Sequence, residues 1–290
     1  MANVDPVRNA AVDVLMRVFR SGAYINVTLD QALRRADISE RGVRFMTQLV
    51  YGTVRHKILC DYIIARHLTQ PMDKLPPPIL IILRMGVFQA LFLNQVTFPA
   101  MVHTSVDLAQ KWGHSGTARL TNAVLRRVPK SIEEIVFPNR EKNLVGHLSV
   151  RYSLPDWMIQ RWLGEHGEEL TESMCEACNT EAPITVRTNT LKTTVDELMA
   201  TLIKRGTGVD KTTSVPEEVT FLAGSPAHSR LFGEGAYCIQ DAASMLPAHL
   251  LQPEPGHRVL DLCAGLGMKT THIAALANNQ ANIAGADPLI

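Results

Sequence analysis

The sequence is poor in cysteine, in aromatic residues and in long apolar runs. Aromatic residues make up 6% and charged residues 20% of the 290 residues, as in ordinary globular proteins of about two domains. The longest apolar run, PPPILIILRMGVFQALFLNQ, is interrupted by Arg84 and falls short of the roughly 20 apolar residues of a membrane span. It predicts a buried helix. The N-terminus lacks the basic and apolar regions of a secretory signal, so we expect a cytoplasmic protein with no membrane partner.

The scarce cysteines also argue against a disulfide framework. Five cysteines are an odd count, and in a chain without a secretory signal they favour reduced thiols. Cys175 and Cys178 form a lone C-x-x-C motif, and neither a second cysteine pair nor histidines at finger spacing follow it. We therefore interpret the pair as part of a helix face. The ten histidines are spread singly, so we expect no metal site.

Charge is distributed unevenly along the chain. Residues 1–130 contain 17 Lys and Arg against 8 Asp and Glu, whereas residues 131–290 contain 12 against 20. A basic half joined to an acidic half favours a polyanion such as nucleic acid as the partner of the first half. The alternative is a solvated helical surface that happens to be basic.

The first 130 residues predict a helical bundle. The first helix is expected to begin with Asp5 as N-cap and Pro6 at its first position, and to end at Gly22. Ser39 is expected to cap a later helix. The stretch PKSIEEIVFPNREKN carries two prolines and mixed charge, and residues 131–142 within it are expected to be a linker.

The rest of the chain predicts mixed α and β structure. Residues 143–235 are expected to form a connecting region of short helices, one β-branched strand and one capped helix. Residues 236–290 then read as a strand, a helix capped near Asp241, and a strand–helix–strand unit with strands at about 257–262 and 281–286. With so few strands, we expect apolar residues of this last part to be poorly buried, namely Val259, Leu260, Ile283 and Leu289.

A glycine-bearing turn follows the first of these two strands. Gly265 and Gly267 allow a ligand to approach the backbone at a helix start. A P-loop would need glycine directly before Lys269, and a dinucleotide fingerprint would need glycine at Thr270. Asp287 is placed to bind ribose hydroxyls. The pattern favours S-adenosylmethionine, an adenosine cofactor without phosphates, over a purely structural turn.

Seven stretches in the same order resemble one family. They are LVYGTVRH, LRMGVFQALFL, TNAVLRRV, RYSLPDWMIQRW, VRTNTLKTT, CIQDAAS and VLDLCAGLGMKTTH. The chain resembles the bacterial small-subunit ribosomal RNA cytosine-C5 methyltransferases of the Sun (RsmB) type. The resemblance implies an all-α NusB-like, RNA-binding bundle followed by an α+β region and the incomplete start of a Rossmann-like α/β methyltransferase domain, truncated within that domain.

The resemblance also implies the cofactor residues. The family's cofactor loop resembles Cys-Ala-Ala-Pro-Gly-Gly-Lys, which falls here on Cys263, Ala264, Gly265, Leu266, Gly267, Met268 and Lys269, and Asp287 matches its ribose-binding acid. Leu266 stands where the family has proline, and Met268 where it has glycine. A positive φ forced on Met268 would cost about 1 kcal/mol or more, so we expect a weakened loop.

No catalytic residue is identified in this chain. The resemblance implies a cysteine thiolate that adds to C6 of cytosine and a second cysteine that assists elimination, each preceded by proline or threonine. Here the residues before the cysteines are Leu59, Met174, Ala177, Tyr237 and Leu262. We therefore expect this chain to be inactive in methyl transfer by itself.

For RNA contact, the sequence points to the end of the predicted bundle, at Arg119, Arg126, Arg127 and Lys130, although a solvated helix face explains them nearly as well. We expect a monomer whose partner is small-subunit ribosomal RNA. Two alternatives stay open: a non-catalytic NusB-like RNA-binding protein in rRNA transcription or ribosome assembly, and a sensor of S-adenosylmethionine.

Overall fold

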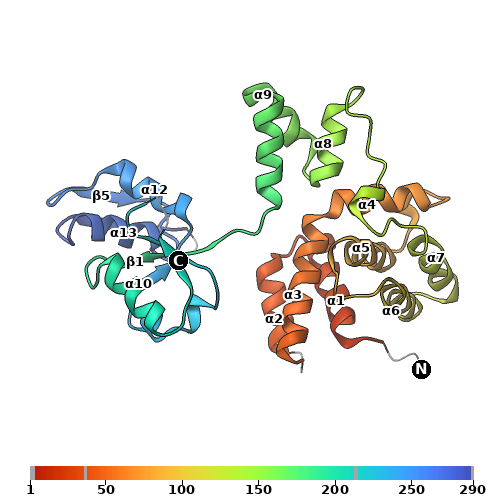
Figure 1. The fold of residues 1–290 in the computed structure, drawn as a ribbon, viewed down its shortest axis with the longest axis horizontal. Coiled ribbons are helices and arrows are strands. Elements are labelled where there is room, and N and C mark those ends of the chain that lie inside the picture. Colours follow the sequence, from red (N-terminus) through yellow and green to blue (C-terminus); the bar gives the residue numbers. More distant parts are fainter. Residues whose placement is uncertain (1–3, 36–37, 212–214, 289–290) are drawn as a thin grey trace. The chain divides into compact units, whose positions relative to one another are not determined.

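The computed structural model describes residues 4–288 apart from 36–37 and 212–214. The chain divides into two compact units, Met1–Thr180 and Glu181–Ile290, and each is described by itself. The first unit is helical and the second contains the sheets (Figure 1). No helix among the described residues is long and apolar enough to cross a membrane.

The first unit opens with the expected bundle. Its helices are α1 (Pro6–Ser21), α2 (Ile25–Arg35), α3 (Glu40–Arg55), α4 (Lys57–His67), α5 (Pro77–Phe92), α6 (Phe98–Lys111) and α7 (Ser115–Leu125), with a 3-10 turn at Met72–Lys74. The predicted helix ends are confirmed. Asp5 accepts a hydrogen bond from the Arg8 amide at 2.8 Å, and Ser39 accepts one from the Gly42 amide. Gly22 ends α1 in the left-handed conformation, with φ 63°.

Helix α5 is the centre of the bundle, as its apolar sequence predicts. Its residues from Ile79 to Gln89 are buried on all sides apart from Leu80, and α1, α3, α4, α6 and α7 pack against it. The buried polar side chains on α5 find partners. Arg84 donates to both carboxylate oxygens of Asp61 at 2.6 and 2.8 Å, and Gln89 accepts from Arg8 Nε at 2.8 Å. The charge that α5 carries into the core is therefore paired.

The segment expected as a linker lies against the bundle. Ile135 belongs to the bundle's apolar core, and the Tyr62 hydroxyl donates to the Val136 carbonyl at 2.7 Å. A 3-10 turn covers Ile132–Glu134. Because these contacts join the segment to α4, the first compact unit continues without a break to Thr180.

Helices α8 (Leu144–Tyr152) and α9 (Asp156–Asn179) complete the first unit. Gly167, with φ 76°, breaks α9 in two, so this stretch has the three helical segments that the sequence predicts. Ser153 accepts hydrogen bonds from the Ile58 and Leu59 amides, which ties the end of α8 to the start of α4. Cys175 lies on the buried face of α9.

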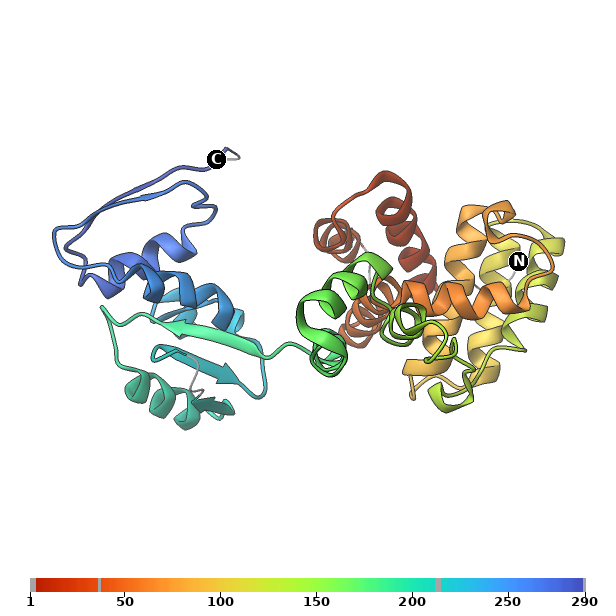
Figure 2. The same cartoon turned by 90° about the horizontal axis from the view of Figure 1, so that it is seen from above.

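The second unit begins with a four-stranded antiparallel sheet of order β2-β3-β1-β4. Its strands are β1 (Ile184–Thr188), β2 (Val209–Lys211), β3 (Glu218–Phe221) and β4 (Tyr237–Ile239). Helix α10 (Val195–Lys204) packs on one face through an apolar cluster that includes Val186 and Leu202. Helices α12 (Ala242–Leu251) and α13 (Met268–Leu276) lie on the other face (Figure 2). A 3-10 turn (Pro226–His228) and the short helix α11 (Arg230–Gly233) lead into β4.

The sequence predicted β1 and β4 but missed β2 and β3. Strand β2 has three residues, and the alternation of polar and apolar residues in β3 (EVTF) covers only four residues, the lower limit for predicting a strand.

The second unit ends in helix α12 (Ala242–Leu251), strand β5 (Arg258–Asp261), helix α13 (Met268–Leu276) and strand β6 (Asn282–Gly285). Strands β5 and β6 pair in parallel, with Val259 opposite Ile283, which confirms the predicted strand–helix–strand unit. Leu260 is 62% exposed, as expected, and Val259 and Ile283 are half-buried. Leu289 lies outside the described residues.

Close packing between α3 and α5 gives a test of the bundle. A Cβ added at Gly52 would overlap the Phe88 ring, whereas one added at Gly164 on α9 would meet nothing within 4 Å. We expect Gly52→Ala to destabilise the protein by about 1–3 kcal/mol through overpacking. The control Gly164→Ala should be neutral or stabilise by up to about 1 kcal/mol, because alanine favours helix. Urea unfolding measures both, and equal effects would contradict this account of the α3–α5 contact.

Candidate cofactor site and basic surfaces

The glycine turn forms a tight loop between β5 and α13. Gly265 and Gly267 adopt positive φ angles of 50° and 81°, and Gly267 is the N-cap of α13. The Gly267 amide donates to the Ala264 carbonyl at 2.8 Å, which closes the turn. The amides of the first turn of α13 therefore face the loop, which is the arrangement that attracts acceptor groups.

Two aspartates hold this loop to the neighbouring chain segments. Asp261 accepts from the Cys263 amide at 3.2 Å and from the Thr270 hydroxyl at 2.7 Å. Asp287, just beyond β6, accepts from the Gly265 amide at 2.9 Å. The structure thus brings Asp287 and the loop Cys263–Lys269 together, although 22 residues separate Gly265 from Asp287.

The expectation of a strained Met268 is wrong. Met268 is the first residue of α13 and is not among the described residues with positive φ. The left-handed positions fall on Gly265 and Gly267 because these residues lack the Cβ that penalises such backbone angles. Leu266 is 94% exposed. Cys263 and Lys269 are also exposed, and Ala264 is half-buried.

Arg187 supports the site and was not predicted. It lies on β1, is 5% exposed, and donates through Nη1 to the Met268 carbonyl at 2.6 Å and to Gln240 Oε1 at 2.7 Å. Its Nη2 donates to the Thr271 hydroxyl at 3.0 Å. Burial lowers the pKa of this guanidinium. Arg187 lies in the VRTNTL stretch of the sequence, but only the tertiary contact shows what it binds.

Burial makes three of the five cysteines poor nucleophiles. Burial raises the pKa of the Cys60 thiol, and it raises the pKa of Cys175 to about 11. Burial also raises the pKa of Cys238, although nearby Arg187 opposes the shift. A raised pKa disfavours the thiolate, which is the reactive form. Of the remaining two, Cys178 is exposed on α9 and Cys263 is exposed in the loop.

The four basic residues predicted to contact RNA are exposed. Arg119 lies on α7, whereas Arg126, Arg127 and Lys130 follow its end. Arg127 lines a cavity of about 290 Å³ together with Arg66 and His67. Burial, followed by the nearby charges of Arg127 and Arg66, lowers the pKa of His67, and Glu134 lines the same cavity.

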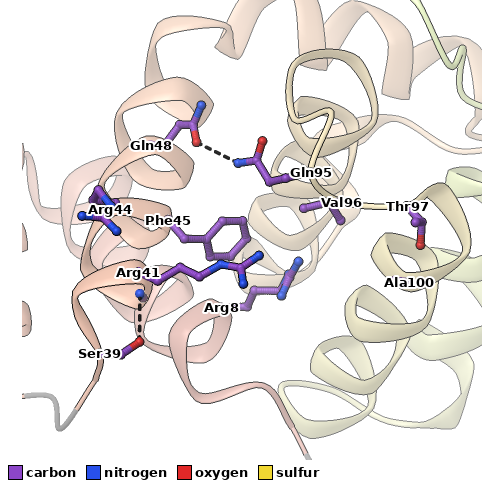
Figure 3. A pocket seen from close by; sticks show the side chains of 11 residues that line it. Arg8, Ser39, Arg41, Arg44, Phe45, Gln48, Gln95, Val96, Thr97 and Ala100 are labelled. Carbon is purple, nitrogen blue, oxygen red and sulfur yellow. Dashed lines mark hydrogen bonds between the residues drawn. The ribbon is translucent and has the colours of Figure 1, made fainter.

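A larger basic cavity was not predicted. It measures about 840 Å³ and lies between α1, α3 and the start of α6 (Figure 3). Arg41 and Arg44, three residues apart on one face of α3, are exposed at its rim. Phe45 lies in its wall with Arg8 stacked 4.6 Å from the ring centroid, and a Gln48–Gln95 hydrogen bond of 3.1 Å closes one side. Cations, amides and an aromatic ring together suit a nucleic-acid ligand.

Comparisons with known proteins match each part of this arrangement. Residues 5–130 match the NusB family, residues 154–227 match the ferredoxin-like domain of RsmF/B-type methyltransferases, and residues 248–289 match the 16S rRNA methyltransferase RsmB/F family. These matches define a class of proteins in which a NusB domain precedes an RNA methyltransferase region. Within this class, the chain carries a NusB domain followed by domains of the RsmB/F methyltransferases.

Similar proteins agree with this assignment. Over 97% of its own length, this chain is 31% identical to the probable ribosomal RNA small subunit methyltransferase B of Bacillus subtilis (strain 168). It is 32% identical to the protein of the same name from Synechocystis sp., again over 97% of this chain. It spans 62% and 63% of the lengths of these relatives. The crystal structure of PH0851 superposes with a TM-score of 0.69 at 27% identity, covering 98% of this chain and 63% of the other.

The loop's dependence on Asp261 can be tested directly. Asp261→Ala removes the acceptor of the Cys263 amide and of the Thr270 hydroxyl. Because hydrogen bonds to a charged group contribute about 1.5–3 kcal/mol, we expect a loss of that order in local stability. Hydrogen exchange of the amides between residues 263 and 270 should accelerate. Asp210→Ala, at an exposed aspartate on β2, is the control, and equal acceleration in both variants would contradict the anchoring role.

Proposed function

We propose that this chain acts in the methylation of small-subunit ribosomal RNA, with S-adenosylmethionine as methyl donor and C5 of a cytosine as acceptor. The observation that carries the proposal is the loop Cys263–Lys269 held against Asp287 at the carboxyl ends of two parallel strands. Relatives named ribosomal RNA small subunit methyltransferase B support the RNA substrate class. A Rossmann-like methyltransferase fold for residues 236–290 is part of the same proposal.

The loop suits an adenosine cofactor without phosphates. Gly267 has no atom within 4 Å of the position of a Cβ, and the exposed Leu266 side chain leaves the turn accessible. Gly265 and Gly267 would allow close approach to the backbone, and the Asp287 carboxylate would accept hydrogen bonds from ribose hydroxyls. When bound, S-adenosylmethionine supplies an electrophilic methyl group. The residues of this chain bind and orient it.

Transfer to C5 of cytosine needs a thiolate, and the chain offers no suitable one. None of its cysteines follows proline or threonine. Cys60, Cys175 and Cys238 have raised pKa values, and Cys263 belongs to the cofactor loop itself. We therefore infer that the 290 residues bind cofactor and RNA without transferring methyl. If radiolabelled methyl reaches ribosomal RNA with this chain alone, that inference is wrong.

RNA contact is proposed for the first unit. The cavity rimmed by Arg41 and Arg44 and the exposed residues Arg119, Arg126, Arg127 and Lys130 would contact phosphates, which gives salt-dependent binding. The net excess of basic residues in residues 1–130 also supports the alternative function, a non-catalytic NusB-like protein of rRNA transcription or ribosome assembly. In that case RNA binding persists and cofactor binding is absent.

Several expectations stay predictions: the domain division at 1–130, 131–142, 143–235 and 236–290, the cytoplasmic location and the monomeric state. They are compatible with the proposed function, because a protein that modifies ribosomal RNA meets its substrate in the cytoplasm. Limited proteolysis tests the domain division, and light scattering tests the monomeric state.

The RNA-binding proposal predicts a charge-specific loss. In the double variant Arg41→Ala and Arg44→Ala, we expect weaker binding to a small-subunit rRNA fragment. The slope of log affinity against log salt should fall by about 0.7–0.9 for each phosphate that is no longer neutralised. Arg161→Ala is the control, because Arg161 is exposed on α9 and pairs with Glu165 at 2.8 Å. Fluorescence anisotropy measures the RNA affinity of both variants. An equal change in salt slope would rule out the cavity as an RNA-binding site.

The cofactor proposal predicts a graded loss at Asp287. Calorimetry should detect S-adenosylmethionine binding by the unaltered chain. Asp287→Ala should weaken it about 10-fold or more, because hydrogen bonds to a carboxylate contribute about 1.5–3 kcal/mol. Asp287→Asn keeps an acceptor for the Gly265 amide, so its affinity for S-adenosylmethionine should lie between those of the unaltered chain and Asp287→Ala. The control Asp196→Ala, at a carboxylate that pairs with Lys211 on the surface, should bind normally. Absence of binding by the unaltered chain would sink the proposal.

A further inference from the structure

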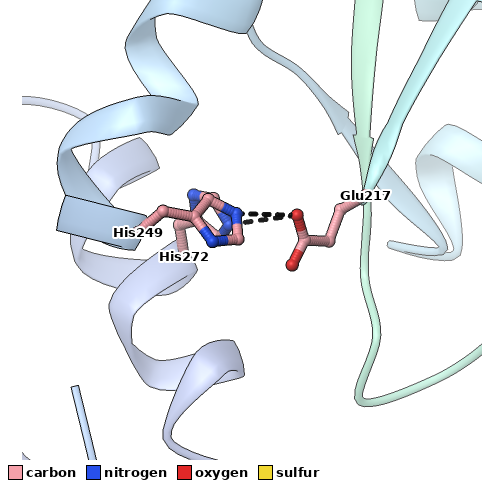
Figure 4. A group of neighbouring side chains, drawn as sticks. All are labelled: Glu217, His249 and His272. Carbon is pink, nitrogen blue, oxygen red and sulfur yellow. Dashed lines mark hydrogen bonds and ion pairs between the residues drawn. The ribbon is translucent and has the colours of Figure 1, made fainter. Parts of the chain in front are cut away.

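Three metal-ligating side chains converge from separate elements of the second unit. Glu217 immediately precedes β3, His249 lies on α12 and His272 on α13 (Figure 4). His249 Nε2 is 2.9 Å from Glu217 Oε2, and His272 Nε2 is 3.9 Å from the same oxygen. One ligand atom from each residue lies within 4.8 Å of the other two. No local spacing joins these residues, so the expectation of isolated histidines overlooked them.

The environment of His272 points independently to a ligand. Its side chain is 1% exposed, and neither ring nitrogen has a hydrogen-bond partner among the described residues. A buried polar group without a partner is costly, and each one calls for an explanation such as an ion. His272 Nε2 faces Glu217, and its ring meets the His249 ring edge-on at 79°. The unpartnered nitrogen is therefore directed into the cluster.

We propose that Glu217, His249 and His272 bind a zinc ion. Two imidazoles and one carboxylate are an established donor set for Zn²⁺, which leaves a fourth position for water. With metal–ligand distances of about 2.0–2.2 Å, tetrahedral ligands lie roughly 3.3–3.6 Å apart. The present separations of 2.9 and 3.9 Å lie on either side of this value, so small side-chain shifts bring the atoms into place.

Burial agrees with this assignment. Glu217 and His272 are buried, and His249 is half-buried, which gives solvent a route to the fourth position.

The metal would join the sheet to both helices on its second face. His272 is four residues beyond Met268, so the site lies one helical turn from the cofactor loop, and Thr271 beside it accepts from Arg187. A bound ion would restrain α12 and α13 and stabilise the native state by mass action. This role is independent of the proposed function, since it requires neither RNA nor methyl donor.

The test uses the untagged 290-residue chain, stripped with chelator and titrated with Co²⁺ as a spectroscopic substitute for Zn²⁺. We expect one equivalent to bind with the intense visible absorption of a four-coordinate site, and Zn²⁺ to displace it. His249→Gln and Glu217→Gln should weaken binding by about 100-fold or more, since even the loss of a residue that only orients a ligand weakens metal sites by about 10–100-fold. His257→Gln is the matched control, because His257 is an exposed histidine that lies 3.7 Å from Glu254.

His249→Gln is the main test variant because His249 is only half-buried, so the substitution should leave the fold intact. Circular dichroism verifies the fold. Raised thermal stability with Zn²⁺ in the unaltered chain and in His257→Gln, but not in His249→Gln, supports the site. Absence of the four-coordinate spectrum, or equal binding by the His249 and His257 variants, overturns it. S-adenosylmethionine and RNA binding, measured on the same metal-free samples, report separately on the proposed function.

Discussion

A buried guanidinium must find acceptors, and Arg187 finds them in two separate parts of the second unit. Its donors reach Gln240 beyond β4 and the Met268 carbonyl at the start of α13, so the antiparallel sheet and the parallel strand–helix–strand unit share one charged group. This is possible because successive side chains of β1 point to opposite faces of the sheet. Val186 faces the apolar cluster under α10, and Arg187 faces the opposite side. The position of the cofactor loop relative to the sheet depends on this interaction.

The need to pair buried polar groups also determines how the helices of the first unit pack. Helix α5 is buried on nearly every side, yet it carries Arg84 and Gln89, and each pairs with a side chain from another helix. These pairs fix how α1 and α4 meet α5, since an unpaired polar group at either position would be costly. The exposed arginines of α3 and those around the end of α7 are then left on the outside of a rigid bundle, where they contribute a positive surface.

The two units supply complementary chemistry to one proposed task. The first presents cations around a cavity, which suits a polyanion. The second presents backbone amides and a carboxylate at the ends of parallel strands, which suits an adenosine cofactor. The match of residues 248–289 to the 16S rRNA methyltransferase RsmB/F family connects these surfaces to the proposed modification of ribosomal RNA. The buried cysteines fit binding better than covalent catalysis, because burial raises the pKa of their thiols.

Much of the fold could be predicted from the sequence where short-range chemistry decides it. The ends of α1 at Asp5 and Gly22, the cap at Ser39, the buried helix α5 and the strands on either side of the glycine turn all follow from residues within a few positions. Gly265, Gly267 and Asp287 were predicted as candidate site residues from the spacing around the turn, whereas the other residues of the loop came from the family resemblance. Strands β2 and β3, by contrast, are too short for their own residue pattern to identify them, and they exist through pairing of β3 with β1 and of β2 with β3.

Tertiary structure alone decided which distant side chains meet. It assigned positive φ to Gly267 and helical geometry to Met268, it directed Arg187 to the loop, and it brought together Glu217, His249 and His272. The physical reason is the distance along the chain over which each kind of interaction acts. Capping and periodicity act between neighbours along the chain, whereas burial, charge pairing and metal ligation depend on distances that exist only after the sheets and helices have packed.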